Sequence, residues 1–562
     1  MAEITKEVIR AYALENALKH EGKSNERAVL SGLFAEGLEK TQIKDYVDKV
    51  REVVEEVNSL SLERQKEEIL RGGHKISKRK VREGLPELEG AVEGKVVMRM
   101  PPFPSGPLHI GNARTLILND EYVKMYKGKL FLVMDDTIGS AEKQIEPEAY
   151  KLIEDGVKWL GVKYEKKIIY KSDRLKIFYD YAEELLRKGY MYVCECSPDK
   201  MRELRAKGVE CSCRRFSPEQ QVERWKKMFN APMGSMCVRL KTSMQDPDPA
   251  FRDRVMFKIS DNPHPRTKKK YRVYPSMDFS WAIDDHLLGV THILRGTDLV
   301  IETRVEKHIW NIFGWEHPKV VYNGHFAIEG VKISKSKGSK EVRSGVYIGW
   351  NDPRTWSLQS LKDRGIHPEA IRQFILSIGL NKTNIKVPVE VLYALNRKFL
   401  ESVPRYFFVE EPEKIRIKGC PELVAKIPLH PDGKKGYKVY NTKQEFFISK
   451  PDYEVMQNRN YRLMHLLNFK SEQVLAIKPR EFSFISEEPT NDLETKFIHW
   501  LPANADNVKT EIRMSDGSVV NGLSEPEVRK LKVGDIIQFE RFGFVRLYKK
   551  KKDRLELWFA HF

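Results

Sequence analysis

Cysteine is scarce in this chain, and long apolar runs are absent. Only 6 of the 562 residues are cysteine, too few for a disulfide scaffold in a chain of this length. No run of about 18 consecutive apolar residues occurs, which excludes a membrane-spanning helix. The opening residues, Met-Ala-Glu-Ile-Thr-Lys-Glu, lack the apolar core of a secretory signal. We therefore expect a cytoplasmic protein with no membrane partner.

Acidic residues are fewer than basic residues. The chain has 98 Lys and Arg against 80 Asp and Glu, a formal charge of 98 − 80 = +18. Such an excess favours a polyanionic partner such as nucleic acid, although charged residues at 32% are also typical of a heat-adapted surface. At roughly 100–200 residues per domain, the length predicts about three to five domains.

The amino-terminal half changes its pattern twice. Residues 1–90 predict a charged helical extension, since Val50, Val53, Val54 and Val57 recur at helical spacing. Residues 91–191 alternate strands and helices, as in the first half of a Rossmann-like α/β domain with a parallel sheet. Ser172 is the predicted cap of one of these helices. Residues 192–272, rich in cysteine and proline, break the alternation and predict an inserted domain.

The α/β pattern resumes over residues 273–340 as the second half of the split domain. Residues 341–403 predict a helical connector, and residues 404–562 predict an all-β region of barrels, with short strands divided by turns. The predicted fold class is thus multidomain: an α/β domain with an insertion, helical parts, and carboxyl-terminal β-barrels.

Two short motifs carry phosphate chemistry. Gly106 and Gly111 flank His109 at a predicted helix start, where amides and the helix dipole favour an anion. The second motif, Lys332-Ile-Ser-Lys-Ser-Lys337, is a cationic loop that could hold polyphosphate as negative charge develops. Taken singly, each motif is more often a polar helix cap or a solvated surface; together, in one interrupted α/β domain, they indicate a nucleotide site.

Four of the cysteines form two close pairs. Cys194 and Cys196 precede a short loop that ends at Cys211 and Cys213. Two such pairs suit a tetrahedral Zn²⁺ site made of four thiolates, although Cys-x₂-Cys is the commoner spacing. The position inside the insertion predicts a structural ion and not a catalytic one.

The two motifs resemble the HIGH and KMSKS signatures of class I aminoacyl-tRNA synthetases. Further segments are similar to the glutamyl/glutaminyl branch, and most closely to archaeal glutamyl-tRNA synthetases: Arg99-Met-Pro-Pro-Phe-Pro-Ser-Gly106, Met134-Asp-Asp-Thr137, Tyr274-Pro-Ser-Met-Asp-Phe279 and Asp284-Asp-His-Leu-Leu-Gly-Val-Thr-His-Ile-Leu-Arg-Gly296. The resemblance is closest from about residue 90 to 410. It departs from the usual signatures at Asn112, where histidine is usual, and at Ile333, where methionine is usual.

The resemblance implies roles for individual residues. His109 and Lys335 would be catalytic, and the ATP site would comprise His109, Ile110, Gly111, Asn112, Lys332, Ser334, Lys335 and Ser336. The amino-acid pocket would comprise Arg99, Asp135, Tyr274 and Arg295. A cationic pocket for a dicarboxylic amino acid is physically sensible, because an unpaired buried carboxylate would be costly.

The implied activity is ATP-dependent ligation of L-glutamate to tRNA(Glu) through a glutamyl adenylate, with Mg²⁺ on the phosphates. tRNA(Gln) is an alternative partner, and residues 404–562 would bind the anticodon, where aromatic and basic residues mix. Three other functions remain open: a glutaminyl-tRNA synthetase, a non-catalytic tRNA-binding paralogue, and a class I-like nucleotidyltransferase that acts on a small alcohol. The sequence names no protein partner.

Overall fold

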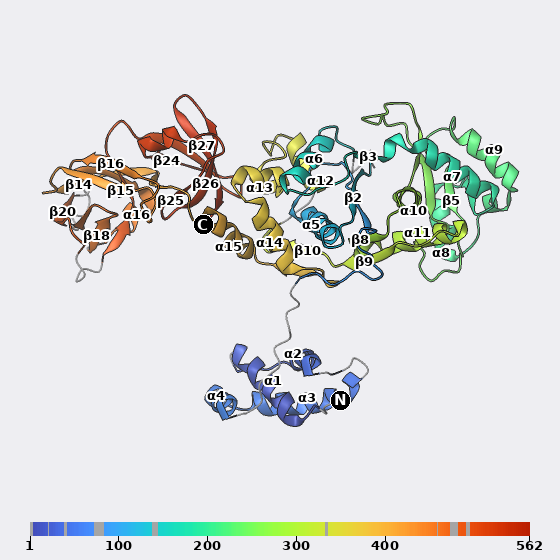
Figure 1. Cartoon of the computed structure of the whole chain (residues 1–562), viewed down its shortest axis with the longest axis horizontal. Coiled ribbons are helices and arrows are strands. Elements are labelled where there is room, and N and C mark those ends of the chain that lie inside the picture. Colours follow the sequence, from blue (N-terminus) through green and yellow to red (C-terminus); the bar gives the residue numbers. More distant parts are fainter. Residues whose placement is uncertain are drawn as a thin grey trace. The chain divides into compact units, whose positions relative to one another are not determined.

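The computed structural model describes residues 4–20, 22–36, 38, 42–71, 84–137, 144–331, 335–457, 459–471, 481–489 and 495–562. The chain forms two compact units, Met1–Gly84 and Leu85–Phe562 (Figure 1). Among the described residues, no helix is both long and apolar enough to cross a membrane.

The first unit is helical. Its helices are α1 (Lys6–Lys19), α2 (Glu26–Leu33), α3 (Ile43–Asn58) and α4 (Leu62–Arg71). Thr5 and Asn25 cap α1 and α2 by accepting backbone N–H bonds. Val50, Val53 and Val57 are fully buried along one face of α3, so the predicted apolar face forms the core of this unit.

The second unit contains an α/β domain. Three parallel strands pair in the order β1-β2-β3, and β8 pairs in parallel with β9. The backbone N–H of Thr291, just before β8, donates to the Val97 carbonyl of β1, so the two groups of strands are neighbours. The elements are β1 (Val97–Met100), α5 (Ile110–Met125), β2 (Lys129–Met134), α6 (Ala149–Trp159), β3 (Ile169–Tyr170), α7 (Leu175–Arg187), α10 (Met277–Leu287), β8 (His292–Gly296), α11 (Val300–Phe313) and β9 (Lys319–Asn323).

An antiparallel sheet interrupts this domain, in the green part of Figure 1. Its strands follow the order β4-β5-β6-β7, and two helices accompany them: β4 (Met191–Cys194), α8 (Pro198–Lys207), α9 (Pro218–Met228), β5 (Cys237–Leu240), β6 (Val255–Ile259) and β7 (Val273–Pro275). Ser197 and Ser217 cap α8 and α9, each followed by proline at the first helical position.

A mostly helical segment follows the α/β domain. It contains β10 (Phe326–Ile328), α12 (Lys335–Arg343), α13 (Leu358–Arg364), α14 (Pro368–Ile378), β11 (Ile385–Val387) and α15 (Val389–Leu400). Strands β10 and β11 pair in parallel. Buried side chains of α13 and α14, including Leu361 and Phe374, belong to the same core as β1 and α5.

The carboxyl-terminal region is almost entirely β. One seven-stranded sheet has the order β12-β25-β26-β27-β23-β24-β13, and another has the order β21-β18-β19-β20-β14-β17-β22. The first comprises β12 (Arg405–Tyr406), β13 (Phe408–Glu410), β23 (Val508–Arg513), β24 (Val519–Ser524), β25 (Ile536–Phe539), β26 (Gly543–Lys550) and β27 (Arg554–His561). The second comprises β14 (Pro412–Lys418), β17 (Glu445–Ser449), β18 (Asn460–Leu463), β19 (Leu467–Ser471), β20 (Glu481–Ser486), β21 (Lys496–Ile498) and β22 (Trp500–Pro502).

A hairpin, β15 (Leu423–Pro428) with β16 (Tyr437–Thr442), and a short helix, α16 (Lys450–Glu454), complete this region. Exposed and buried residues alternate along β16, as expected for a strand with one face in the core. The predicted fold class is confirmed.

One local prediction is wrong. Ser172 does not cap a helix, because α7 begins only at Leu175. Ser172 lies in a 3₁₀ turn, where its hydroxyl donates to Asp136 Oδ2 at 2.8 Å and its backbone N–H donates to Asp136 Oδ1 at 2.9 Å. A buried carboxylate, which local sequence patterns do not show, determines the conformation of this serine.

Candidate active site

A cavity of about 750 Å³ lies where β8 and β9 end and α5 begins. Its lining includes His109, Gly111, Asn112, Gly296, Asp298 and Gly324. Open α/β sheets bind ligands outside the carboxyl ends of their strands, so the cavity occupies the expected place for a nucleotide. Three of the predicted ATP-binding residues, His109, Gly111 and Asn112, therefore meet at one cavity.

His109 and Asn112 form a reciprocal cap at the start of α5. The His109 Nδ1 atom accepts the Asn112 backbone N–H at 3.3 Å, and Asn112 Oδ1 accepts the His109 N–H at 3.3 Å. Because Nδ1 accepts, the neutral imidazole carries its proton on Nε2, the donor form that suits a phosphate oxygen. A Cβ on Gly111 would lie only 3.0 Å from the His109 ring, so glycine makes room for this arrangement.

Ile110 has a different environment. Its side chain is fully buried in the core, and its N–H donates to the Trp356 carbonyl. Ile110 therefore holds the start of α5 in place, and its side chain faces the core.

The second motif lies partly outside the described residues. The structure does not describe Lys332, Ile333 and Ser334. Helix α12 begins at Lys335 and Ser336, for which only the backbone is described. The Trp350 ring packs against both the first motif and α12. A Cβ atom added to Gly106 of the first motif would lie 2.7 Å from this ring, and one added to Gly338 of α12 would lie 3.4 Å from it. Glu146 adds a second link, because it accepts from Ser339 and Arg343 of α12 while its N–H donates to the Pro104 carbonyl.

Arg99 and Arg295, the predicted amino-acid-binding cations, lie close to Trp281, as does Lys171. Arg99, Arg295 and Lys171 lie 5.0, 5.0 and 5.1 Å from its ring, and all three are buried. Arg99 forms a bidentate pair with Asp285, with Nε–Oδ1 and Nη2–Oδ2 distances both 2.8 Å. Each cation has a carboxylate partner inside the protein, which offsets the cost of burying its charge.

Arg295 retains donors of its own. Only its Nη1 atom binds Glu306, at 3.0 and 2.9 Å from the two carboxylate oxygens. Within the part of the chain that the structure describes, no acceptor meets Arg295 Nε or Nη2, although both atoms are buried. Burial raises the pKa of Glu306, while Arg295 lowers it. Two unmatched donors on a buried guanidinium are suited to an incoming carboxylate.

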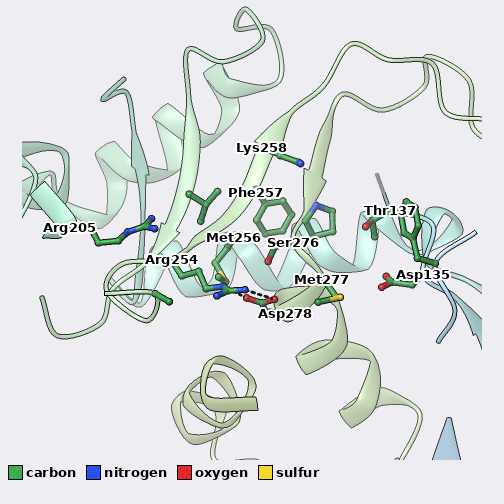
Figure 2. Close-up of a pocket in the computed structure, with 14 residues that line it drawn as sticks. Asp135, Thr137, Arg205, Arg254, Met256, Phe257, Lys258, Ser276, Met277 and Asp278 are labelled. Atoms are coloured by element: carbon green, nitrogen blue, oxygen red, sulfur yellow. Dashed lines mark hydrogen bonds and ion pairs between the residues drawn. The ribbon is translucent and has the colours of Figure 1, made fainter. Parts of the chain in front are cut away.

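Asp135 connects this cluster to a second cavity, of about 580 Å³. It lies 3.1 Å from Lys171 Nζ, and Figure 2 shows it with Thr137 on one side of the cavity, facing the paired Arg254 and Asp278. Tyr274 is buried on β7, and its hydroxyl donates to the Tyr271 carbonyl at 3.0 Å. Asp135 is thus brought together with the cationic cluster, whereas among the described residues Tyr274 forms no hydrogen bond with Arg99, Arg295 or Lys171.

The four predicted metal ligands converge. Their sulfur atoms all lie within 4.8 Å of one another, with Sγ–Sγ distances of 3.6 Å from Cys194 to Cys211 and 3.5 Å from Cys196 to Cys211. Tetrahedral Zn²⁺ with Zn–S bonds of about 2.3 Å requires about 3.8 Å between sulfurs. The buried Arg239 donates from Nη1 to Cys194 Sγ at 3.9 Å, which compensates thiolate charge. The residues therefore fit Zn²⁺.

Sequence reasoning missed several residues of the site. Trp281, Asp285 and Glu306 were not singled out, nor were Lys171 and Trp350. Trp281 and Asp285 are four residues apart, a step that places two side chains on one face of a helix, but no helix was predicted there. Lys171 and Glu306 offer no such local signal, because each pairs with a residue outside its own secondary-structure element.

Comparisons with known proteins agree with this geometry. Residues 95–402 match a family model described as tRNA synthetases class I (E and Q), catalytic domain, and residues 403–483 and 497–548 match two models of the anti-codon binding domain of that family. A glutamate–tRNA ligase of Methanocaldococcus jannaschii is 41% identical over 99% of this chain and 100% of that relative. Those of Pyrococcus furiosus and Pyrococcus abyssi are 42% and 41% identical, each over 98% of both chains.

Proposed function

The chain belongs to the class I aminoacyl-tRNA synthetases of the glutamyl and glutaminyl branch, and on that basis we propose that it activates glutamate with ATP and charges tRNA(Glu). It is an enzyme that ligates glutamate to tRNA, since the relatives named for that reaction align with nearly its whole length. The two unmatched buried donors of Arg295, whose chain neighbour Gly296 lines the nucleotide cavity, are the structural observation that supports glutamate most directly.

In the first step, a carboxylate oxygen of glutamate attacks the α-phosphorus of ATP, and the bond to the β-phosphate oxygen breaks to release pyrophosphate. The protein supplies no covalent nucleophile. It orients the reactants and stabilises the charge that moves onto the leaving group. His109 Nε2 donates to a phosphate oxygen, and Lys335 at the start of α12 stabilises the pyrophosphate. Lys332, Ser334 and Ser336 complete the cationic loop.

The second step transfers the acyl group. The 2′-hydroxyl of the terminal ribose attacks the carbonyl carbon of the adenylate, the mixed anhydride bond breaks, and AMP leaves with the electron pair. Mg²⁺ accompanies the ATP substrate and neutralises its phosphates.

Arg99, oriented by Asp285, binds the side-chain carboxylate of glutamate, and Arg295, with its two unmatched donors, lies near the substrate carboxylate. A neutral glutamine side chain would leave one of these two arginines without an anionic acceptor, which favours glutamate. Asp135 lines the adjoining cavity, and Tyr274 is a buried residue of β7 next to Pro275, which also lines that cavity.

Two features outside the reacting centre complete the proposal. Zn²⁺ bound by Cys194, Cys196, Cys211 and Cys213 stabilises the inserted domain, residues 192–272, which holds the acceptor end. The β region from residue 404 onward binds the anticodon. The appended helical domain ends at Gly84 and not at the predicted residue 90, because Leu85 and Leu88 pack in the core of the second unit. The scarcity of cysteine supports a reducing, cytoplasmic setting.

Aminoacylation of two tRNA transcripts tests this assignment. Purified enzyme is incubated with ATP, Mg²⁺ and labelled glutamate or glutamine, and with tRNA(Glu) or tRNA(Gln). We expect glutamate on tRNA(Glu), and any glutamate on tRNA(Gln) measures the breadth of tRNA choice. Attachment of glutamine to tRNA(Gln) in place of these products would overturn the proposed amino acid.

A further inference from the structure

A buried arginine at the nucleotide cavity has no acidic partner. Arg114 lies on α5, five residues beyond His109, and is 1% exposed. Burial lowers the pKa of its guanidinium, and no ion pair joins it to a carboxylate among the residues that the structure describes. An arginine nevertheless keeps its charge inside proteins, so the positive charge must be compensated by other groups.

Two backbone carbonyls receive the guanidinium. Nη1 donates to Gly324 O at 2.9 Å, and Nη2 donates to Gly379 O at 3.0 Å. Gly379 ends α14 with a positive φ of 65°, so its carbonyl belongs to the negative end of that helix. The fork of Arg114 therefore joins α5 to two elements that are far apart in sequence.

The turn at Gly324 forms part of the cavity wall. Gly324 lines the cavity, as Arg114 does. The strand that follows Gly324 in the chain, β10, precedes the second motif, residues 332–337. The opposite side of this turn is packed against residues 381–384: the Gly324 N–H donates to Asn381 O at 2.7 Å, and a Cβ on Gly324 would lie 2.1 Å from Thr383 O. Asn384 Oδ1 also accepts the His325 N–H at 2.8 Å. The turn is therefore held from both sides.

We propose that Arg114 is a positioning residue for ATP: its two hydrogen bonds, to the carbonyls of Gly324 and Gly379, fix the cavity wall at Gly324 in the position that the nucleotide requires. This proposal rests on the proposed function, because it assigns the cavity to ATP. This role requires the planar guanidinium of Arg114 and not its charge alone, because the side chain must donate to two carbonyls on different elements at the same time.

Steady-state ATP–pyrophosphate exchange with the full chain tests the proposal. In Arg114→Lys the charge stays but the fork is lost, and we expect KM for ATP to rise about tenfold with KM for glutamate within about twofold of wild type. Asn384→Ala, which removes the acceptor of the His325 N–H in the same turn and alters a side chain of the cavity lining, should raise KM for ATP in the same selective way. Because Asn384 is exposed, this variant is expected to fold.

Arg364 provides a matched control. It is also fully buried and binds backbone carbonyls, those of Phe559 and Ala560, but lies on α13 away from the cavity lining. Arg364→Lys should lower Tm about as much as Arg114→Lys and leave KM for ATP unchanged.

Chemical rescue separates positioning from general damage. In Arg114→Ala, methylguanidinium should restore KM for ATP toward the wild-type value, whereas methylammonium, which has charge without the fork, should not. Equal rescue by both ions, or an unchanged KM for ATP in Arg114→Lys and Asn384→Ala, would overturn the proposal. A wild-type enzyme with no glutamate-dependent exchange would instead overturn the proposed function.

Discussion

Asp285 holds Arg99 through two parallel hydrogen bonds of 2.8 Å, in a site where both side chains are almost completely buried. Both partners come from segments with strong motif similarity, yet the pairing joins positions that are 186 residues apart. Arg99 is thus neither a surface ion pair nor a free cation. Its planar guanidinium is oriented by a carboxylate of the protein.

Asp285→Asn tests this orientation. The amide keeps the shape of the side chain but removes its negative charge, so Arg99 becomes a buried cation without its full partner. We expect KM for glutamate to rise about tenfold and the free energy of unfolding to fall by about 3 kcal/mol. Asp261→Asn, in the exposed pair with Arg272, is the control and should change neither quantity appreciably. An unchanged KM for glutamate in Asp285→Asn would contradict the assigned role of Arg99.

Arg295→Lys tests the two unmatched donors. Lysine retains a positive charge near Glu306 but cannot present Nε and Nη2 to a second carboxylate. KM for glutamate is expected to rise at least about tenfold, with KM for ATP unchanged. Pyrophosphate exchange at varied glutamate and varied ATP measures both values, and a selective effect on ATP would be the contrary result.

Zinc content tests the cysteine cluster. The purified wild-type protein should contain one Zn²⁺ per chain by elemental analysis, and Cys211→Ser should lose it, because Cys211 lies within 3.6 Å of two other ligand sulfurs. Cys420→Ser provides the control, since that buried thiol lies outside the cluster, and its zinc content should equal that of the wild type. Full zinc occupancy in Cys211→Ser would exclude the four-cysteine site.

Acid should destabilise the carboxyl-terminal β region through His499. Burial, with Arg541 beside it, lowers the pKa of His499 to about 4. Arg541 Nη1 donates to His499 Nδ1 at 3.1 Å and is itself paired with Asp452. In the unfolded chain this histidine takes up a proton near pH 6.5, so stability is complete above that pH and falls as the pH drops toward 4.

The expected loss is about 3 kcal/mol across this window. Calorimetry of the wild type and of His499→Gln at several pH values measures it, because the variant should have a flatter dependence of Tm on pH. His317→Gln, at an exposed histidine, should keep the wild-type slope. Parallel curves for wild type and His499→Gln would refute the assigned pKa shift.

Much of the fold could be predicted from the sequence because its elements have local signatures. Apolar spacing predicted the core face of α3, and the glycines around His109 predicted the start of α5. The sequence could not predict that Asn112 completes the cap, although this explains why an asparagine is suited to that position.

The charged network could not be predicted in the same way. Asp285, Glu306 and Lys171 act through partners brought close only by the folded sheet, so no local spacing indicates them. Ser172 shows the reverse case, a good local cap signal that a buried carboxylate overrides. The roles of Lys332 and Ser334 stay predictions, because they lie outside the described residues.

The most direct test of the account is ATP–pyrophosphate exchange with glutamate or glutamine, each measured with and without total tRNA. The unmatched donors of Arg295 predict exchange with glutamate and none with glutamine. Exchange driven by glutamine would contradict the assignment of the carboxylate site, and a lack of exchange under all four conditions would contradict the mechanism as a whole.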